Sequence, residues 1–434
     1  MASISRSLER IKQELARLVP PELIERICRD VKHAYRKRKL DPLTTIHLFI
    51  QQVLYGNTAI SDLPHHSKVR FDPSAYCEAR MRLPLAVLQR LLRHVADAVA
   101  GEVEGRGLWL SHRTWLLDGS SCSMPDTPEL QKAFGQSGQQ KAGCGFPTAH
   151  LLAMFDAASG MLMDVIAAPL RTSDFSLVSR VHPLMCAGDV VVADRGFCSY
   201  AHLAMLQARG VHAVLRLHQH MTAPFDPPRP NGRGVPGKVL GRQDQLVAWH
   251  KPTSKPAWIS RTDFDALPST LSVRVLRYRV EDRGCRSHEI TLVTTLLDDA
   301  RYTKGKLARL FAMRWRVEGD LRDLKITLNM DVLKSKTEAG VRKELAIYAV
   351  VYNLVCLVRQ RAAVAQRRPA SRLSFIDVLR WLRTAEPGEP MPRFVVNPRR
   401  PGRHEPRAYK RRHKEFDRMT RPRAEYKKRL QLQG

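Results

Sequence analysis

The stretch that decides the fold reads Asp189-Val-Val-Val-Ala-Asp194, a nearly continuous run of β-branched residues between two carboxylates. Runs of this length and composition are typical of strands that are covered on both faces of a sheet. Arg195-Gly196 follows, and a helical spacing of apolar residues returns between Tyr200 and Gln207. The sequence therefore predicts a buried strand that ends in Asp194, followed by a short turn and a helix.

The segments around this strand predict the rest of an α/β domain. Thr114-Trp-Leu-Leu-Asp118 is a second apolar run that ends in a carboxylate, and Gly119-Ser120 after it is typical of a turn. Residues 150–167 are expected to form a β-hairpin, and residues 212–217 the next strand. Asp174 is expected to cap a helix that reaches Met185. This order predicts a mixed sheet with helices against its faces.

Periodicity and composition divide the chain of 434 residues into five segments. Residues 1–108 show helical spacing, first at Ile11, Leu15 and Leu18, and are expected to form a helical N-terminal domain. The α/β domain is expected over residues 109–219 and 291–366, interrupted by a β-rich insertion over 220–290. Residues 367–434 are expected to form a basic C-terminal tail.

The helical N-terminal segment contains two candidate helix starts, Ser61-Asp62-Leu63 and Asp72-Pro73-Ser74, separated by a basic loop. Such a pair allows a helix-turn-helix that docks on DNA. A helical bundle that only packs against the rest of the protein explains the same pattern equally well.

The charge balance indicates a polyanionic partner. Lys plus Arg total 72 against 42 Asp plus Glu, a net charge of +30, and this field attracts phosphates at ordinary salt. Residues 391–434 alone hold 15 basic residues against 4 acidic ones, most densely at Lys410-Arg-Arg-His-Lys414. Such a tail either grips phosphates or is a solvated end. A membrane surface or a ribosome would also suit this balance, so composition names nucleic acid only as the first hypothesis.

Cysteine usage and hydropathy favour a cytoplasmic protein with reduced thiols and no membrane segment. The eight cysteines form no C-x-x-C pair, and no secretory signal precedes Cys28. The most apolar N-terminal stretch, from Leu43 to Leu54, is far short of the ~20 apolar residues that a membrane helix needs. His112, His150 and His182 lack the closely spaced partners that zinc sites use.

Asp118 and Asp194 are the first candidates for chemistry. An Asp after a strand is ordinarily a turn residue. Two such residues on adjacent strands of one sheet would meet, and Asp and Glu are the ligands that magnesium prefers. Two divalent ions ~3.5–4 Å apart can activate a nucleophile and stabilise the leaving group in phosphodiester cleavage. Other acids, Asp126, Asp156, Asp164 and Asp189, are explained as turn, hairpin and strand residues.

A later segment, Phe311-Ala-Met-Arg314-Trp-Arg-Val-Glu318-Gly-Asp-Leu-Arg-Asp-Leu-Lys325, places an arginine, a glutamate and a lysine on one face of a helix predicted over 304–328. An ordinary ladder of surface ion pairs has the same spacing. Asp320 and Asp323 lie about 200° and 140° around an ideal helix from Glu318, so they are weaker ligand candidates.

The spacing of Arg314, Glu318 and Lys325 resembles the Tyr-x2-Arg-x3-Glu-x6-Lys signature of bacterial insertion-sequence DDE transposases of the fourth group, the IS-four family. The resemblance spans roughly residues 60–360. It also rests on four further groups of motifs, which are Leu117-Asp118-Gly119-Ser120, Pro125-Asp126-Thr127 with Phe134-Gly135, Ala193-Asp194-Arg195-Gly196-Phe197, and Leu292-Val-Thr-Thr-Leu296.

The resemblance implies a ribonuclease-H-like core with Asp118 on the first strand, Asp194 on the fourth and Glu318 on a late helix. By that resemblance these three are the catalytic residues and bind two Mg²⁺ ions, for which Mn²⁺ would substitute. The implied partners are double-stranded DNA, namely transposon ends and target, and a second copy of the chain in a synaptic complex. No small-molecule substrate is implied, and the expected location is the bacterial cytoplasm at the nucleoid.

Five residues are expected to contact DNA. Arg314 would hold a phosphate bidentately and Lys325 as a point charge. Phe311 stands where the family has Tyr, a loss on the order of 1 kcal/mol of hydrogen bonding to phosphate. Trp315 would either stack on an unpaired base or pack in the core, and Arg195 completes the set.

The leading functional interpretation is a transposase that cuts DNA and transfers the strand. A metal-dependent nuclease with the same core would share the three carboxylates. A catalytically decayed DNA-binding remnant is a third reading, against which the intact carboxylates argue.

Overall fold

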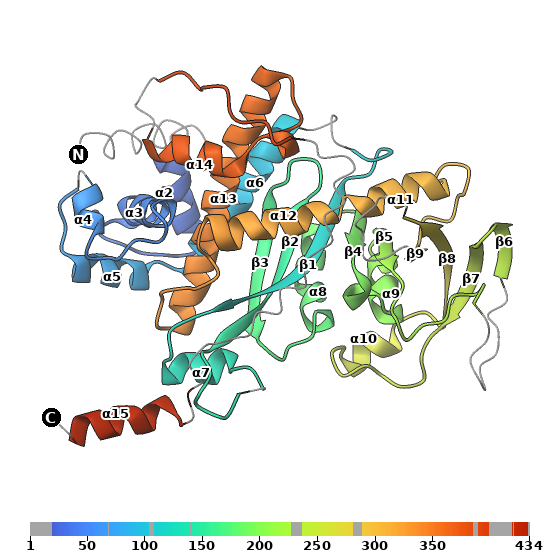
Figure 1. Ribbon diagram of the computed structural model, residues 1–434, viewed down its shortest axis with the longest axis horizontal. Helices are drawn as coiled ribbons and strands as arrows, with labels where there is room; N and C mark the ends of the chain where they lie inside the picture. The colour runs from blue at the N-terminus through green and yellow to red at the C-terminus, as the bar shows by residue number, and fades with distance from the viewer. Residues whose placement is uncertain are drawn as a thin grey trace.

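The computed structural model describes residues 20–67, 69–103, 108–138, 140–226, 237–280, 289–384, 389–398, 419 and 421–432. Its centre is a nine-stranded mixed sheet in the order β3-β2-β1-β4-β5-β9-β8-β7-β6, with helices packed around it (Figure 1). The predicted mixed α/β class is confirmed. The strands are β1 Thr114–Ser123, β2 Thr148–Asp156, β3 Leu162–Pro169, β4 Val190–Ala193, β5 His212–Arg216, β6 Gly237–Gly241, β7 Asp244–His250, β8 Thr270–Arg279 and β9 Glu289–Thr294.

The middle of the sheet is parallel, and its central strand β4 is fully buried. β4 pairs in parallel with β1 on one side and with β5 on the other, and Val190–Ala193 is buried at every position. The hairpin of β2 and β3 adds two antiparallel strands beside β1. A strand of four apolar residues can be covered on both faces without exposing a polar side chain, which is why this run forms the centre.

The strands between residues 237 and 294 extend the same sheet. β9 pairs antiparallel with β5, and β8, β7 and β6 follow outward in antiparallel order. Arg274 on β8 and Asp244 on β7 form a buried bidentate pair, with Nε–Oδ1 at 2.7 Å and Nη2–Oδ2 at 2.6 Å. The predicted β-rich insertion is therefore continuous with the core sheet through hydrogen bonds, and its limits at 220 and 290 stay a prediction.

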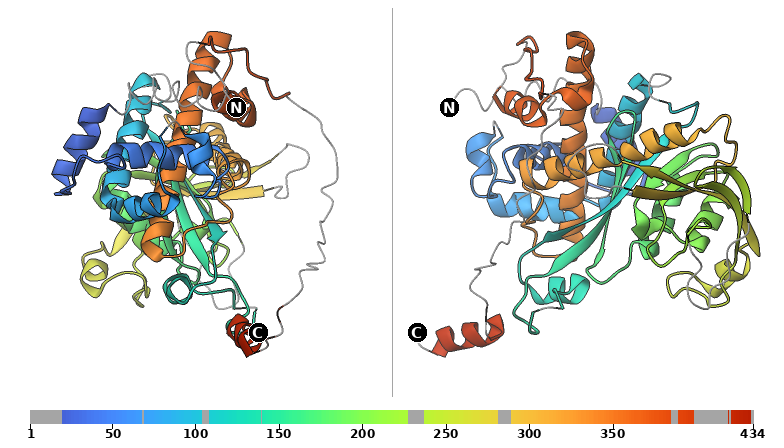
Figure 2. Two further views of the ribbon diagram at one scale, coloured as in Figure 1. Left: turned by 90° about the vertical axis from the view of Figure 1, so that its left-hand side faces the viewer. Right: turned by 45° about the vertical axis from the view of Figure 1, so that its right-hand side comes forward.

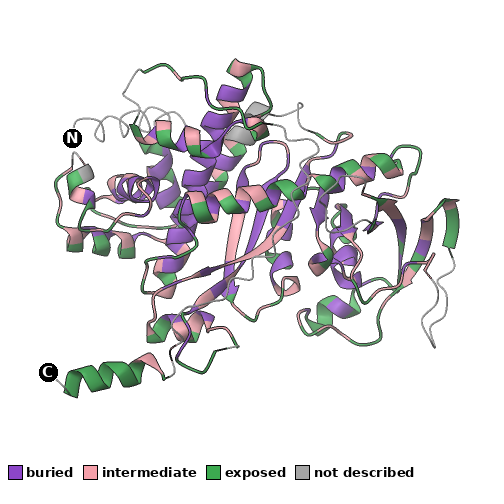
Figure 3. Cartoon of the chain, viewed as in Figure 1, coloured by how far each residue is buried: buried purple, intermediate pink, exposed green. Residues whose placement is uncertain are grey.

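The N-terminal helices and α14 form a second layer around one long buried helix, α13. Figure 2 shows α13 running through this layer, and Figure 3 shows it largely buried. It packs against α3, α6 and β3, and one hydrophobic cluster continues from the N-terminal helices into the sheet. The helices are α2 Pro21–Asp30, α3 Pro42–Leu54, α4 Leu63–His66, α5 Pro73–Arg82, α6 Leu85–Val103, α7 Pro128–Phe134, α8 Phe175–Val181, α9 Tyr200–Ala208, α10 Arg261–Asp265, α11 Lys304–Ala312, α12 Trp315–Arg322, α13 Glu338–Gln366, α14 Phe375–Thr384 and α15 Arg423–Leu432.

Helix α5 starts where a cap was expected, at Asp72, whose carboxylate accepts from the N–H of Ser74 and Ala75. The other predicted start leads only to the four residues of α4, and the helix-turn-helix stays a prediction. The predicted helical pattern at Ile11–Leu18 and the cluster Lys410–Lys414 lie outside the described residues. Across the part of the chain that the structure describes, no helix is long and apolar enough to cross a membrane.

Two stacked histidines make stability depend on pH. His182 and His202 are buried, with ring centroids 5.3 Å apart. Burial lowers the pKa of His182 to about 3 and that of His202 to about 4. The unfolded rings take up protons near pH 6.5, whereas the buried rings stay neutral down to their lowered pKa values. Each ring should therefore lower the free energy of unfolding by about 1.4 kcal/mol per pH unit within that range.

Denaturant unfolding between pH 7.5 and 5.5 should therefore show a steeper loss of stability in the natural chain than in His182→Phe. The comparison removes one titrating ring while other groups are kept. Equal slopes in the two proteins would contradict the prediction.

Candidate active site

Asp118 and Asp194 lie side by side on neighbouring parallel strands. Leu117 of β1 pairs with Ala193 of β4, so the two aspartates are the next residues along these strands. The structure corrects one expectation: β1 does not turn at Gly119-Ser120 but runs on to Ser123, paired with β2. Asp118 therefore stands in mid-strand, at the point where β4 ends.

One carboxylate oxygen of Asp194 lacks a hydrogen bond from the residues that the structure describes. Its Oδ1 is buried and accepts no hydrogen bond within the described part of the chain. The nearest cation is Arg216 on β5, whose Nη1 lies 3.9 Å from that oxygen. A buried carboxylate oxygen without a hydrogen bond is costly unless a positive charge approaches it.

Asp118 is electrostatically coupled to the other two carboxylates. Burial raises the pKa of Asp118 to about 6, and the negative charges of Glu318 and Asp194 add to the rise. Arg314 and the N–H of Gly119, which donates to Asp118 Oδ1 at 2.9 Å, oppose it. The three predicted carboxylates thus share one region of the protein.

The segment that carries Glu318 is divided, not one regular helix as predicted over 304–328. α11 ends at Ala312, α12 begins at Trp315, and a π-helical turn, η3, follows over Asp323–Thr327. Lys325 lies within this π-helical turn, and its Nζ pairs with Asp331 Oδ1 at 3.0 Å. The helix is therefore not regular at Lys325, and the shared face of Lys325 and Glu318 stays a prediction.

Arg314 lies between two of the candidate ligands. Its side chain is 7% exposed, and its Nη2 lies 3.4 Å from Glu318 Oε1 while its Nη1 lies 4.0 Å from Asp118 Oδ2. Glu318 is half exposed. The guanidinium therefore neutralises part of the negative charge that Asp118 and Glu318 bring together.

The remaining DNA-contact candidates occupy different positions. Phe311 is buried, with 1% of its surface exposed, and therefore does not reach DNA directly; its ring centroid is 5.8 Å from the Arg314 guanidinium carbon. Trp315 is 42% exposed, which goes against core packing, and the same carbon lies 4.7 Å from its ring centroid. Arg195 is exposed and donates to Gln219 at 3.0 Å.

Sequence reasoning missed the position of the Asp174 carboxylate, which lies against the glycines of both aspartate motifs. Asp174 does not cap α8 with its side chain; its Oδ1 lies 2.8 Å from His150 Nε2. A Cβ on Gly119 would stand 2.9 Å from Oδ1 of Asp174, and one on Gly196 would stand 3.2 Å from Oδ2. The signal was the glycine in each motif, since both leave space for the same side chain.

The residues present suit a divalent metal by donor chemistry. Asp118, Asp194 and Glu318 offer hard oxygen ligands, and one of those oxygens lacks a hydrogen-bond partner among the described residues. As these side chains stand, no three His, Cys, Asp or Glu groups of the described chain are close enough to enclose an ion. Metal binding here would require Arg314 to give up its ion pairs.

The helix α12 offers a test of local stability at Gly319. A Cβ at this position would meet no atom within 4 Å, so alanine fits and removes the entropic cost of glycine in a helix. Gly319→Ala should raise the free energy of unfolding by about 1 kcal/mol. Gly119→Ala, whose Cβ would press on Asp174, should not raise it. Denaturant titration of both variants checks this, and equal behaviour would contradict it.

The part of the chain that carries Asp118, Asp194 and Glu318 also matches a known family. Residues 109–354 match the family described as "Transposase DDE domain". This stretch is more than half of the chain, and the chain belongs to that family.

Individual relatives are distant. "Transposase InsG for insertion sequence element IS4" of Escherichia coli (strain K12) is 24% identical over 285 residues, which are 65% of this chain and 60% of the relative. The chain thus matches about three fifths of that relative's length. "Putative transposase InsZ" of the same organism is 22% identical over 280 residues, 62% of this chain and 91% of the relative.

A solved structure also shows similarity, the cryo-EM structure of the piggyBac transposase synaptic complex with hairpin DNA. The two chains are 9% identical with a TM-score of 0.44, over 87% of this chain and 79% of the other.

Proposed function

We propose that this protein is a DNA transposase that binds the ends of an insertion sequence, cuts DNA and joins the cut strand to target DNA. The observation that carries the proposal is the pairing of Leu117 with Ala193, which places Asp118 and Asp194 together within reach of the Glu318 segment. Membership of the DDE family supports the same reading.

The three carboxylates are proposed to be catalytic and to hold two divalent ions, Mg²⁺ or Mn²⁺. Such ions, when bound, activate the attacking oxygen and stabilise the leaving one. Asp194 would contribute its Oδ1, which accepts no hydrogen bond from the described residues, and Asp118 and Glu318 would contribute the oxygens that Arg314 now faces.

The protein's own cations would position the scissile strand. Arg314, released from the two carboxylates, could hold a phosphate with two parallel hydrogen bonds. Lys325 would contribute a point charge after leaving Asp331, and exposed Trp315 would offer a stacking surface to a base. Phe311 would act only by supporting Arg314.

The finer fold assignment is part of this proposal. The first five strands stand in the order β3-β2-β1-β4-β5, with Asp118 on the first and Asp194 after the fourth, which supports a ribonuclease-H-like core. We further propose DNA contacts by the N-terminal helices and the basic tail, a homodimer at paired DNA ends, and action at the bacterial nucleoid.

The proposal is tested by the products made from DNA that carries the element's ends. Purified protein, Mg²⁺ and such DNA with a target plasmid should yield joined strands, and Asp118→Asn should yield none. Cutting without joining would replace the transposase by the nuclease. Binding with neither reaction, in Mg²⁺ and in Mn²⁺, would identify a decayed remnant.

A further inference from the structure

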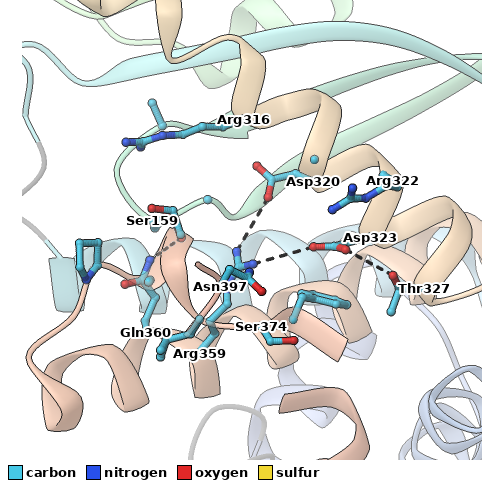
Figure 4. A pocket seen from close by; sticks show the side chains of 18 of the residues that line it. Ser159, Arg316, Asp320, Arg322, Asp323, Thr327, Arg359, Gln360, Ser374 and Asn397 are labelled. Carbon is cyan, nitrogen blue, oxygen red and sulfur yellow. Dashed lines mark hydrogen bonds and ion pairs between the residues drawn. The ribbon is translucent and has the colours of Figure 1, made fainter. Parts of the chain in front are cut away.

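One side of α12, the helix that carries Glu318, borders a cavity. A cavity of about 640 Å³ lies between α12, η3 and the later elements α13 and α14 (Figure 4). On the other side of α12, the side chains of Val317 and Leu321 are buried. A cavity provides no contacts for the residues that line it, so packing alone leaves this side of the helix loosely defined.

One buried cation spans the gap. Arg359 of α13 has a side chain only 9% exposed. Its Nη2 lies 3.8 Å from Asp320 Oδ1, and its Nη1 lies 4.0 Å from Asp323 Oδ2 (Figure 4). Asp320 belongs to α12 and Asp323 begins η3, so a single guanidinium holds the end of the helix and the start of the π turn.

Burial makes the ion pairs of Arg359 with Asp320 and Asp323 important for stability. The side chains of Asp320 and Asp323 are both largely buried, with 15% and 17% of their surface exposed. The guanidinium Nε has no hydrogen-bond partner among the described residues. A buried cation with no carboxylate beside it would be strongly unfavourable, so the pairs resist separation.

We propose that Arg359 is a positioning residue for Glu318, on the basis of the function proposed above. By holding Asp320 and Asp323, it sets the rotation of α12 and the start of η3. Glu318 stands two residues before Asp320 on α12, so this rotation decides where its carboxylate meets those of Asp118 and Asp194. Arg359 itself does not touch the reacting groups.

The test separates positioning from simple stability by comparing two variants. Arg359→Met leaves two buried acids without their cation, whereas Arg359→Met/Asp320→Asn/Asp323→Asn removes the unpaired charges as well. Mn²⁺ affinity of the full chain is measured without DNA by paramagnetic resonance of free Mn²⁺, and stability by denaturant titration. Arg359→Met should lose stability and bind Mn²⁺ about 10-fold more weakly, the range for groups that orient metal ligands.

The triple variant decides the question. It should regain most of the lost stability but keep the weakened Mn²⁺ affinity, because neutral side chains no longer fix the helix. If the triple variant binds Mn²⁺ as tightly as the natural chain, Arg359 has only a structural role. This variant carries the test even where Arg359→Met does not fold.

Two controls complete the experiment. Arg274→Met/Asp244→Asn removes another buried pair, away from the carboxylates, and should leave Mn²⁺ affinity unchanged; a similar loss there would overturn the inference. Glu318→Ala should weaken Mn²⁺ binding. If it does not, the proposed metal site itself fails. If only Glu318→Ala weakens binding, the proposed function stands and the role of Arg359 falls.

Discussion

Asp194→Ala is expected to abolish DNA strand cleavage while leaving DNA binding largely intact. The substitution removes the carboxylate whose buried Oδ1 accepts no hydrogen bond from the described residues, and it leaves Arg216 without this ion-pair partner. Loss of a direct metal ligand should exceed the ~10–100-fold loss typical of outer partners. The measurement is cleavage of labelled DNA, with DNA binding followed separately by fluorescence anisotropy.

The matched control for this experiment is Asp299→Ala, which removes an exposed carboxylate and should cleave like the natural chain. Full cleavage by the Asp194 variant would contradict the site assignment. Loss of both cleavage and DNA binding would show instead that the variant is misfolded, which a thermal melt would reveal.

Asp244→Ala should cause the largest loss of stability. It leaves the Arg274 guanidinium, 1% exposed, without the carboxylate that accepts from its Nε and Nη2. Removing one partner of a buried pair typically costs about 3–5 kcal/mol, because the other charge stays buried. Denaturant titration measures the change, and a loss below 1 kcal/mol would contradict the argument.

The comparison variant is Asp265→Ala, which breaks an exposed pair with Arg261 and should change stability little. If Asp244→Ala also lowers DNA cleavage, the outer strands support the site through the sheet. If the outer strands only extend the sheet, Asp244→Ala should lower stability and leave DNA cleavage unchanged.

The centre of the fold was predictable from local sequence. Val190–Ala193 has no polar residue that could face solvent, so burial on both faces followed, and with it the meeting of Asp118 and Asp194. The length of β1 was not predictable, because Ser120–Ser123 resembles a loop. Pairing with β2 makes it a strand, and such pairing depends on residues far away in the sequence.

The divided glutamate segment could not have been predicted. Neither glycine nor proline stands at Met313-Arg314, where α11 gives way to α12. The break coincides with the burial of Arg314 between Asp118 and Glu318, a tertiary effect. Lys325, which pairs with Asp331, lies in a π-helical segment that has no simple sequence signature.

The core that α13 shares with the N-terminal helices limits where the chain can be truncated. The family match begins at residue 109, yet α3 and α6 cover the flank of α13, whose residues are buried along most of its length. A fragment cut at the family boundary would expose that flank to water and invite aggregation. The N-terminal helices therefore cannot be exchanged as a unit between relatives. Changes of specificity should be made by substituting surface residues.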